Sequence, residues 1–292
     1  TSRTASYREK GQMDGTFGCY TIRPFANAED ALPYTAGWIK AIGGLTQKEA
    51  LARAQKLLEG LEQSRDRLVI ANPLLLRLAV TLYVERNEIP RNRAELYNYY
   101  INKVLVGRER KREEGVSWER RQLEEGLEAV AWTLQILGPK AIPQLTSVVE
   151  REIQAVKEGE GESLVVYLRE RLGLLSSYDY KGKEILAFRH MTFREFFVAQ
   201  RLRKVWNTDK EETWNFLQPR LHHPDWKEPI LFLAAMLSHA GGSELVERIL
   251  NAKSLHEQDL HQDLILAGKC LENSTSLRID LRRTIVDRLF HL

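Results

Sequence analysis

The chain has 292 residues, of which 43% are hydrophobic and 28% are charged, with a net charge of +3. This composition is typical of a folded water-soluble protein with room for two or three small domains, and the charge balance gives no reason to expect a nucleic-acid or anionic-membrane partner. No apolar run approaches the roughly 20 residues that span a bilayer, and no signal peptide opens the sequence. Cys19 and Cys270 are too far apart to indicate a disulfide framework, so we expect a cytoplasmic protein.

Residues 1–27 have an irregular pattern in which the segment CYTIRPF predicts a short strand. The sequence begins Thr1-Ser2-Arg3 without a methionine, so we expect it to be a piece of a longer protein. We interpret residues 1–27 as the remaining edge of a sheet whose other strands precede them.

Residues 28–102 are predicted to form a helical subdomain. A capping box at Thr46 and Glu49 predicts a helix that begins at Gln47, because each residue can bond the backbone N–H of the other. Asn72 is a favourable N-cap and Pro73 suits the first helical position, so a second helix is expected there. A long helix is expected from Asn92 onward.

Residues 103–205 are predicted to form a winged-helix domain, since three helical segments precede two strands around a tight turn at Lys181 and Gly182. Winged helices often bind DNA through the helix before the wing. Here that helix, ESLVVYLRERL, is apolar and charge-balanced, which disfavours insertion into a DNA groove.

The segment AFRHMTFREFFVAQRL, residues 187–202, places a histidine just before a predicted helix. Thr192 and Glu195 match a capping box, so the helix is expected to begin at Phe193. His190 would then lie at the positive end of the helix, where an imidazole could help to hold a phosphate. The alternative is a buried histidine bonded to a backbone carbonyl.

Residues 206–292 are predicted to form a helical repeat-like domain. The segments that start at Pro229 and Asp263 share an apolar pattern at an offset of 34 residues, and each is followed by a second helix. Stacked helical pairs give such an offset.

Motifs for a self-contained enzyme are missing from the sequence. The Gly-Lys pairs at Gly182 and Gly268 lack the first glycine of a phosphate-binding loop. His256 and His261 are five residues apart, so on a helix they would lie on different faces and could not bind one zinc ion together. His222 and His223, beside a proline, are expected to have a structural role in a loop. We therefore predict no catalytic residues and no metal ligands.

Three segments in this order resemble NACHT-type members of the signal-transduction ATPases with numerous domains, a class that includes the NOD-like receptors. They are TSR, NPLLLRLAVTLYVERNEIPRNRAELYNYYINKVL and FRHMTFREFFVAQRL. The run HPDWKEPILFLAAML also looks like the segment that follows the winged helix in those proteins, and the resemblance covers about Thr1 to Leu237. It implies a mainly α chain that comprises the end of a P-loop α/β core, a helical subdomain, a winged helix with a small β-hairpin, and helical, HEAT-like repeats.

The resemblance also implies three nucleotide-binding residues. Arg3 would be the sensor 1 residue that faces the γ-phosphate of ATP, Pro73 would pack on the adenine, and His190 would contact the β-phosphate of ADP. The sequence departs from the family at Ala71, where a glycine is usual, and it contains neither the phosphate loop nor the acidic Mg-binding strand. The intact protein would bind ADP or ATP with Mg, whereas this piece alone would bind neither tightly.

The expected function is therefore part of an ATP/ADP-dependent signalling switch, in defence or regulation, that binds partner proteins or its own copies on activation. Two alternatives remain open. One is a helical scaffold for protein–protein interaction without a working nucleotide site. The other, disfavoured by the low net charge, is a winged-helix regulator that binds nucleic acid.

Overall fold

The computed structural model describes residues 23–63, 67–109, 118–137, 164–170, 172–180, 183–274 and 277–292. These residues are mainly helical with one two-stranded sheet, so the expected mainly α class is confirmed. None of their helices is long and apolar enough to cross a membrane. Arg3, most of the predicted N-terminal strand and residues 138–163 of the predicted winged-helix domain lie outside the described residues.

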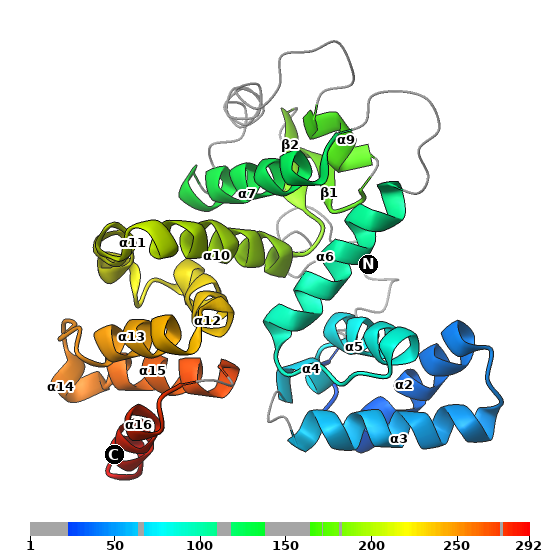
Figure 1. Ribbon diagram of the computed structural model, residues 1–292, viewed down its shortest axis with the longest axis horizontal. Helices are drawn as coiled ribbons and strands as arrows, with labels where there is room; N and C mark the ends of the chain where they lie inside the picture. Colours follow the sequence, from blue (N-terminus) through cyan, green and yellow to red (C-terminus); the bar gives the residue numbers. More distant parts are fainter. Residues whose placement is uncertain are drawn as a thin grey trace, which may run out of the picture.

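The first group of helices forms the blue and cyan lobe in Figure 1. Its members are α2 (Ala28–Gly43), α3 (Gln47–Gln63), α4 (Arg67–Ala71), α5 (Pro73–Arg86) and α6 (Arg93–Glu109). The predicted capping box of α3 is confirmed, since Glu49 Oε2 accepts from Thr46 N at 3.0 Å and Thr46 Oγ1 accepts from Glu49 N at 3.4 Å. Asn72 caps α5, with Pro73 in its first turn, as the sequence predicts.

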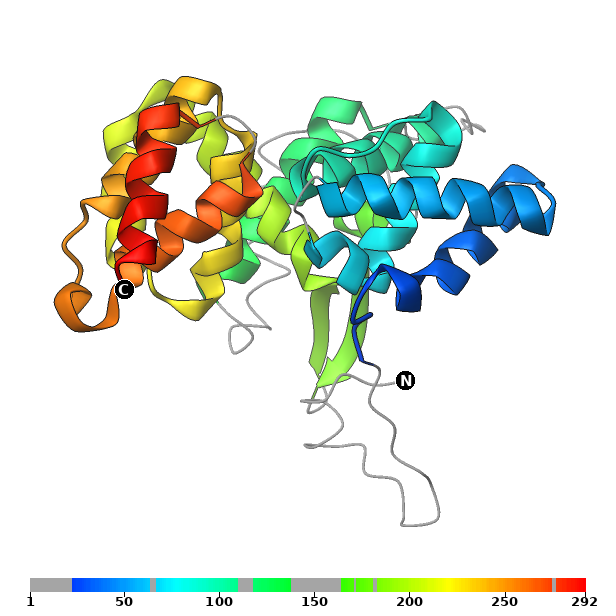
Figure 2. The ribbon, with the colours of Figure 1, turned by 90° about the horizontal axis from the view of Figure 1, so that it is seen from below.

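The second group surrounds the sheet. It contains α7 (Arg120–Leu137), α9 (Leu164–Glu170), β1 (Leu175–Tyr180), β2 (Lys183–Phe188) and α10 (Met191–Thr208). The strands are antiparallel and pair Leu175 with Phe188 and Tyr180 with Lys183, so the two-residue connection falls at 181–182, where the sequence predicts the turn. Figure 2 shows the hairpin projecting from the helical body on the same side as residues 23–27.

The third group is wholly helical in its described residues. It contains α11 (Lys210–Leu217), η1 (Gln218–Arg220), η2 (Pro224–Trp226), α12 (Lys227–Met236), α13 (His239–Leu250), α14 (Glu257–Leu260), α15 (Gln262–Asn273) and α16 (Ile279–Phe290). The two segments with the 34-residue offset are α12 and α15, which are each followed by a packed second helix, α13 and α16. Helix α15 also packs against α12 and α13, so the two pairs lie side by side.

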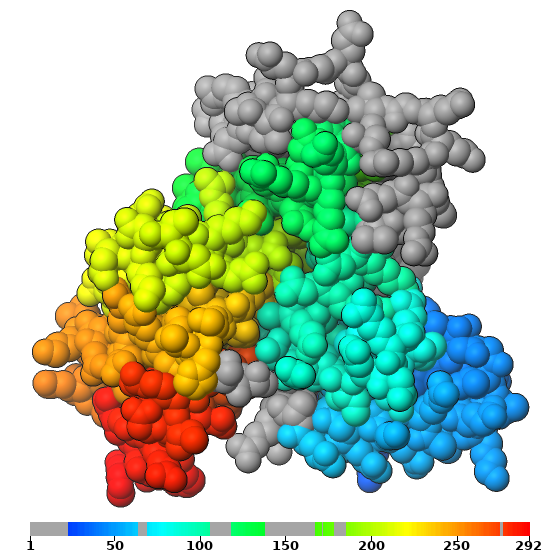
Figure 3. Space-filling view, in the orientation of Figure 1, coloured from blue at the N-terminus to red at the C-terminus, as the bar shows by residue number. Residues whose placement is uncertain are grey.

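Helix α10 connects the groups because it packs against α6, α7, α11 and α12. Its buried face carries Phe193, Phe196 and Phe197, which meet Tyr97 of α6 and Phe232 of α12 in one aromatic cluster. Figure 3 shows the yellow and orange part of the C-terminal helices in contact with the cyan surface of the first lobe, where α12 packs against α6. The core is thus continuous across all three groups.

The predicted start of α10 is wrong. The helix begins at Met191 with His190 as its N-cap, because Phe193 N–H already donates to the carbonyl oxygen of His190 at 3.1 Å. Thr192 therefore lies inside the helix and does not cap it, and its hydroxyl is buried. Burial of the phenylalanine face turns Thr192 and the half-buried Glu195 toward the interior, which overrides the local capping preference.

Candidate functional site

Pro73 lies beside an aromatic group at the start of α5. Tyr34 of α2 donates its hydroxyl hydrogen to the carbonyl oxygen of Pro73 at 3.0 Å, and the Tyr34 ring is 5.4 Å from that of Phe25. Phe25 N–H donates to the carbonyl oxygen of Ala71 at 3.1 Å, which fixes this segment against the helix. The half-buried Pro73 thus lies next to the hydroxyl end of Tyr34, whose ring packs on Phe25.

His190 is exposed at the junction of β2 and α10. It has extended backbone dihedrals, and its imidazole does not cap the helix that follows. Its ring centroid is 6.2 Å from that of Phe193. The neighbouring Arg189 N–H donates to the carbonyl oxygen of Leu174 at 2.9 Å, which ties this turn to the start of the hairpin. The structure does not make His190 the buried, core-packed residue of the alternative interpretation.

The predicted site residues therefore have separate surroundings. Pro73 contacts Tyr34 of α2, whereas His190 has a ring contact within its own helix. Both lie at the N-terminal ends of long helices, where backbone N–H groups and the helix dipole favour an anion. Arg3 lies outside the described residues.

A buried polar group that the sequence did not predict lies where α6, α10, α12 and α15 meet. We call Arg93, Glu195, Glu228 and Asn273 the Arg93 cluster. The Arg93 guanidinium donates to Glu228 Oε2 at 3.0 Å and, through Nε and Nη2, to Asn273 Oδ1 at 3.1 and 2.7 Å. The Arg93 side chain is only 7% exposed, so its charge depends on these partners.

Glu195 is the second carboxylate of this cluster. Burial, together with the nearby negative charge of Glu228, raises the pKa of Glu195 to about 7, while Arg194 and Arg93 partly oppose the change. Asp225 adds a smaller effect in the same direction as Glu228. A carboxyl group with this pKa changes its charge near neutral pH at the contact between α10 and α12.

The pKa of Glu195 predicts how stability depends on pH. Because the folded pKa is above the ordinary value of 4.5, the folded state keeps a proton that the unfolded state loses, and stability falls as pH rises from about 4.5 to about 7. Glu195→Gln should remove this pH dependence. Between pH 5 and pH 8 the free energy of unfolding of the wild type should therefore fall by about 1 to 3 kcal/mol more than that of the variant. Urea unfolding at both pH values measures this difference.

Glu62→Gln, on an exposed part of α3, is the matched control and should leave the pH dependence of the wild type unchanged. Parallel stability profiles for wild type and Glu195→Gln would show that the Glu195 carboxyl is ionised in the folded protein throughout this range.

The Arg93 cluster could not be found from neighbouring residues, because Arg93 is 135 residues from Glu228 and 180 from Asn273. One local feature of the sequence does suggest a distant partner for Arg93. It is the first residue of α6, where the helix dipole disfavours a positive charge. A basic residue at that position indicates a partner elsewhere in the fold.

Other candidates for chemistry are weak in the part of the chain that the structure describes. The Cys270 thiol is buried, which raises its pKa to about 12 and leaves it protonated at neutral pH. No group of three or more His, Cys, Asp or Glu side chains in this part could hold a metal ion. His256 and His261 flank the short helix α14 and do not share a helix face.

No protein-family model matches the chain, and no curated protein matches its sequence. The family resemblance therefore stays a prediction that rests on the order of motifs along the sequence.

Proposed function

We propose that the chain is the distal part of a NACHT-type signalling switch that binds ADP or ATP. The observation that carries the proposal is the position of His190, which is exposed, directly follows the hairpin and precedes an 18-residue helix that it does not cap with its imidazole. In this interpretation α7, α9, the hairpin and α10 form the winged helix, and the helices from α11 onward form HEAT-like repeats.

The residues present fit the phosphate and adenine ends of an adenine nucleotide. His190 can donate a hydrogen bond to a phosphate oxygen, and the base can pack on Pro73 beside Tyr34. A nucleotide held in this way ties the winged helix to the first lobe. The phosphate loop, the Mg ligands and Arg3 at the γ-phosphate would be supplied by the nucleotide-binding core of the intact protein.

The switch follows from the difference between the two nucleotides. Pro73 and His190 together would favour the closed arrangement when ADP is bound, and loss of the His190 contact on exchange for ATP would permit self-association. The Arg93 cluster joins α6 to α12 and α15, so a movement of the first lobe is transmitted to the C-terminal helices. Those helices sense or relay the signal, and the protein acts in the cytoplasm, in defence or regulation.

His190→Ala should weaken ADP binding to the intact protein by about 1 to 3 kcal/mol, the usual effect of losing a charge-assisted hydrogen bond. Isothermal titration calorimetry at fixed salt measures this change. His239→Ala is the matched control because His239 is also exposed at the start of a helix, α13, and it should leave ADP affinity unchanged. Equal ADP affinity for folded His190→Ala and wild type would contradict the assignment.

A helical scaffold is the second candidate, and one feature favours it. Helix α16 packs on α15 and buries Leu281 and Ile285, while Ile279, Val286 and Phe290 are exposed to solvent. Exposed apolar side chains of this kind often bind partner helices. Absence of any ADP binding by the intact protein would favour this second function over the nucleotide switch.

A further inference from the structure

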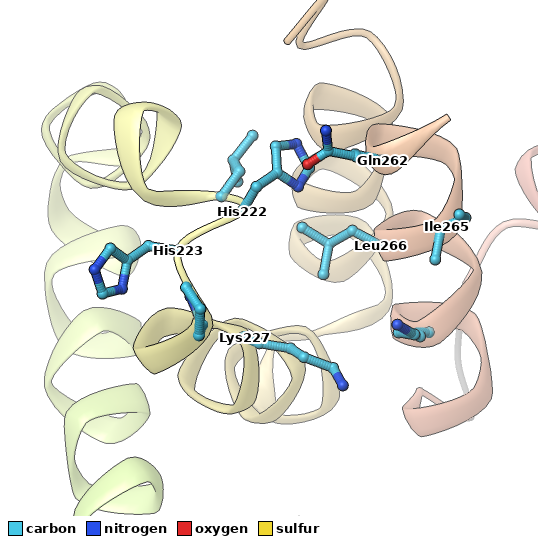
Figure 4. A pocket seen from close by; sticks show the side chains of 9 residues that line it. His222, His223, Lys227, Gln262, Ile265 and Leu266 are labelled. Atoms are coloured by element: carbon cyan, nitrogen blue, oxygen red, sulfur yellow. The ribbon is translucent and has the colours of Figure 1, made fainter. Parts of the chain in front are cut away.

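A cavity of about 200 Å³ lies between the turn before α12 and one face of α15 (Figure 4). Residues 221–227 form one wall, and the other wall carries residues at positions i, i+3, i+4 and i+7 of the same helix face. The side chains used below are His222, Lys227, Gln262, Ile265, Leu266 and Lys269. Neither Pro73 nor His190 is among its lining residues, so the inference is independent of the proposed nucleotide site.

The cavity contains positive charge that the protein does not neutralise. The ammonium groups of Lys227 and Lys269 and the side-chain amide of Gln262 have no hydrogen-bond or ion-pair partner among the described residues. No carboxylate lines the cavity. Lys204, by contrast, pairs with Glu128 at 2.8 Å. Two ammonium groups on one cavity whose lining carries no carboxylate make it electropositive, which favours an anionic ligand.

The wall beside these lysines is held rigidly. His222 Nε2 lies 2.7 Å from Asp263 Oδ1, and Asp263, which is fully buried, accepts the Ser254 N–H through its other oxygen at 2.9 Å. Ser254 Oγ lies 3.1 Å from the same His222 nitrogen. The imidazole is therefore fixed in place before any ligand arrives, which lowers the entropy cost of binding.

Two of the N-terminal amides of α15 already have an acceptor within the protein. Glu257 already accepts the N–H groups of Asp263 at 2.6 Å and Leu264 at 3.3 Å. Binding of an anion would therefore rest on the lysine side chains and not on these two amides. Lys227 and Lys269 come from α12 and α15, which pack against each other.

Apolar side chains separate the polar groups. Leu266 and Leu221 are almost fully buried at the cavity, and Ile265, 40% exposed, lies between Gln262 and Lys269 along the helix face. A ligand that fits both features has an anionic end and a small apolar end. The volume of this cavity is below the range of about 300 to 1,000 Å³ typical of sites for drug-sized ligands, which favours a small ligand.

We infer that this cavity binds a small phosphate monoester, with its phosphoryl oxygens accepting from Lys227 and Lys269 and its organic group against Leu221 and Leu266. A phosphate dianion carries up to two negative charges, which matches the two ammonium groups better than the single charge of a carboxylate. The charge of the dianion is met by the two lysines.

The experiment is calorimetric titration of the 292-residue chain with phenyl phosphate, with benzoate and phenol as the comparison ligands. Lys227→Gln and Lys269→Gln should each weaken phenyl phosphate binding by about tenfold, the scale of one charge-assisted hydrogen bond. Lys56→Gln on the exposed face of α3 makes the same charge change elsewhere and should leave the affinity unaltered. Affinity should also fall as salt is raised, because the cavity is open to solvent.

The amide resonances of Gln262 locate the binding. In an NMR titration with phenyl phosphate, its side-chain NH₂ signals should shift in the wild type and much less in Lys269→Gln. Failure of phenyl phosphate to bind at millimolar concentration, or equal binding by wild type and both lysine variants, would overturn the inference. Benzoate or phenol binding as tightly as phenyl phosphate would show that the phosphate class is wrong. Each of these results leaves the ADP measurement on His190 unaffected.

Discussion

Arg93→Ala is expected to destabilise the protein by about 3 to 5 kcal/mol, the usual cost of removing one partner of a buried ion pair. The variant leaves Glu228 without its ion-pair partner and Asn273 Oδ1 without its two donors, and it also removes the guanidinium that lies 5.2 Å from the centre of the Phe232 ring. The change should further disfavour ionised Glu195, because Arg93 is one of the charges that oppose its raised pKa. Urea unfolding followed by circular dichroism measures the loss.

A double-mutant cycle separates the interaction energy of the Arg93–Glu228 ion pair from the cost of leaving one partner without the other. Arg93→Ala combined with Glu228→Gln should cost less than the sum of the two single changes, because the second change removes the uncompensated carboxylate. Arg121→Ala is the control, since Arg121 forms an i,i+4 pair at an 84% exposed site and its loss should be hard to detect. Strict additivity of the Arg93 and Glu228 changes would mean that the ion pair does not couple the two helices.

Local capping was predictable from the sequence. Thr46 with Glu49, and Asn72 with Pro73, begin their helices as expected, because each arrangement depends on residues within one helical turn. The strands on both sides of positions 181–182 pair as expected for the same reason. Where the stabilising partners are neighbours in sequence, the local sequence pattern is enough to predict where a helix begins or a turn lies.

The start of α10 and the Arg93 cluster were not predictable in this way. Thr192 and Glu195 match a capping box, but the phenylalanines beside them must face Tyr97 and Phe232, and that tertiary contact fixes where the helix begins. Arg93 joins residues more than a hundred positions away. The same limit explains why the cavity beside α15 was missed, since His222 indicated only a structural loop and its bond to Asp263 spans 41 residues.

Of the residues proposed for nucleotide binding, the surroundings of Pro73 and His190 are defined, and both lie where a helix begins. The sequence predicted the position of Pro73 well because an N1 proline follows its own cap. It placed His190 too far before its helix, because α10 begins at Met191, two residues earlier than the expected start at Phe193. That shift places the imidazole at the N-cap itself, closer to the positive end of α10 than the sequence alone indicated.

Phe196→Ala should cost about 3 to 5 kcal/mol, comparable to the loss of Arg93, because the side chain is fully buried and alanine leaves a cavity at the meeting point of three helices. The Phe196 ring lies 5.5 Å from Tyr97 and 5.9 Å from Phe232, so contacts to α6 and α12 are lost together. Phe196→Leu keeps more of the volume and should cost less. Unfolding by urea gives both values.

Phe290→Ala, at an 84% exposed position of α16, is the matched control and should change stability little. Phe196 and Arg93 share one neighbour, Phe232, so the combined variant should depart from additivity. If the Phe196 and Arg93 effects add within error, the aromatic cluster and the Arg93 cluster are independent, and α10 does not link the first lobe to the C-terminal helices through Phe232. A measurable coupling instead makes Phe232 the contact through which a change at α6 reaches α12, as a relay between the lobes requires.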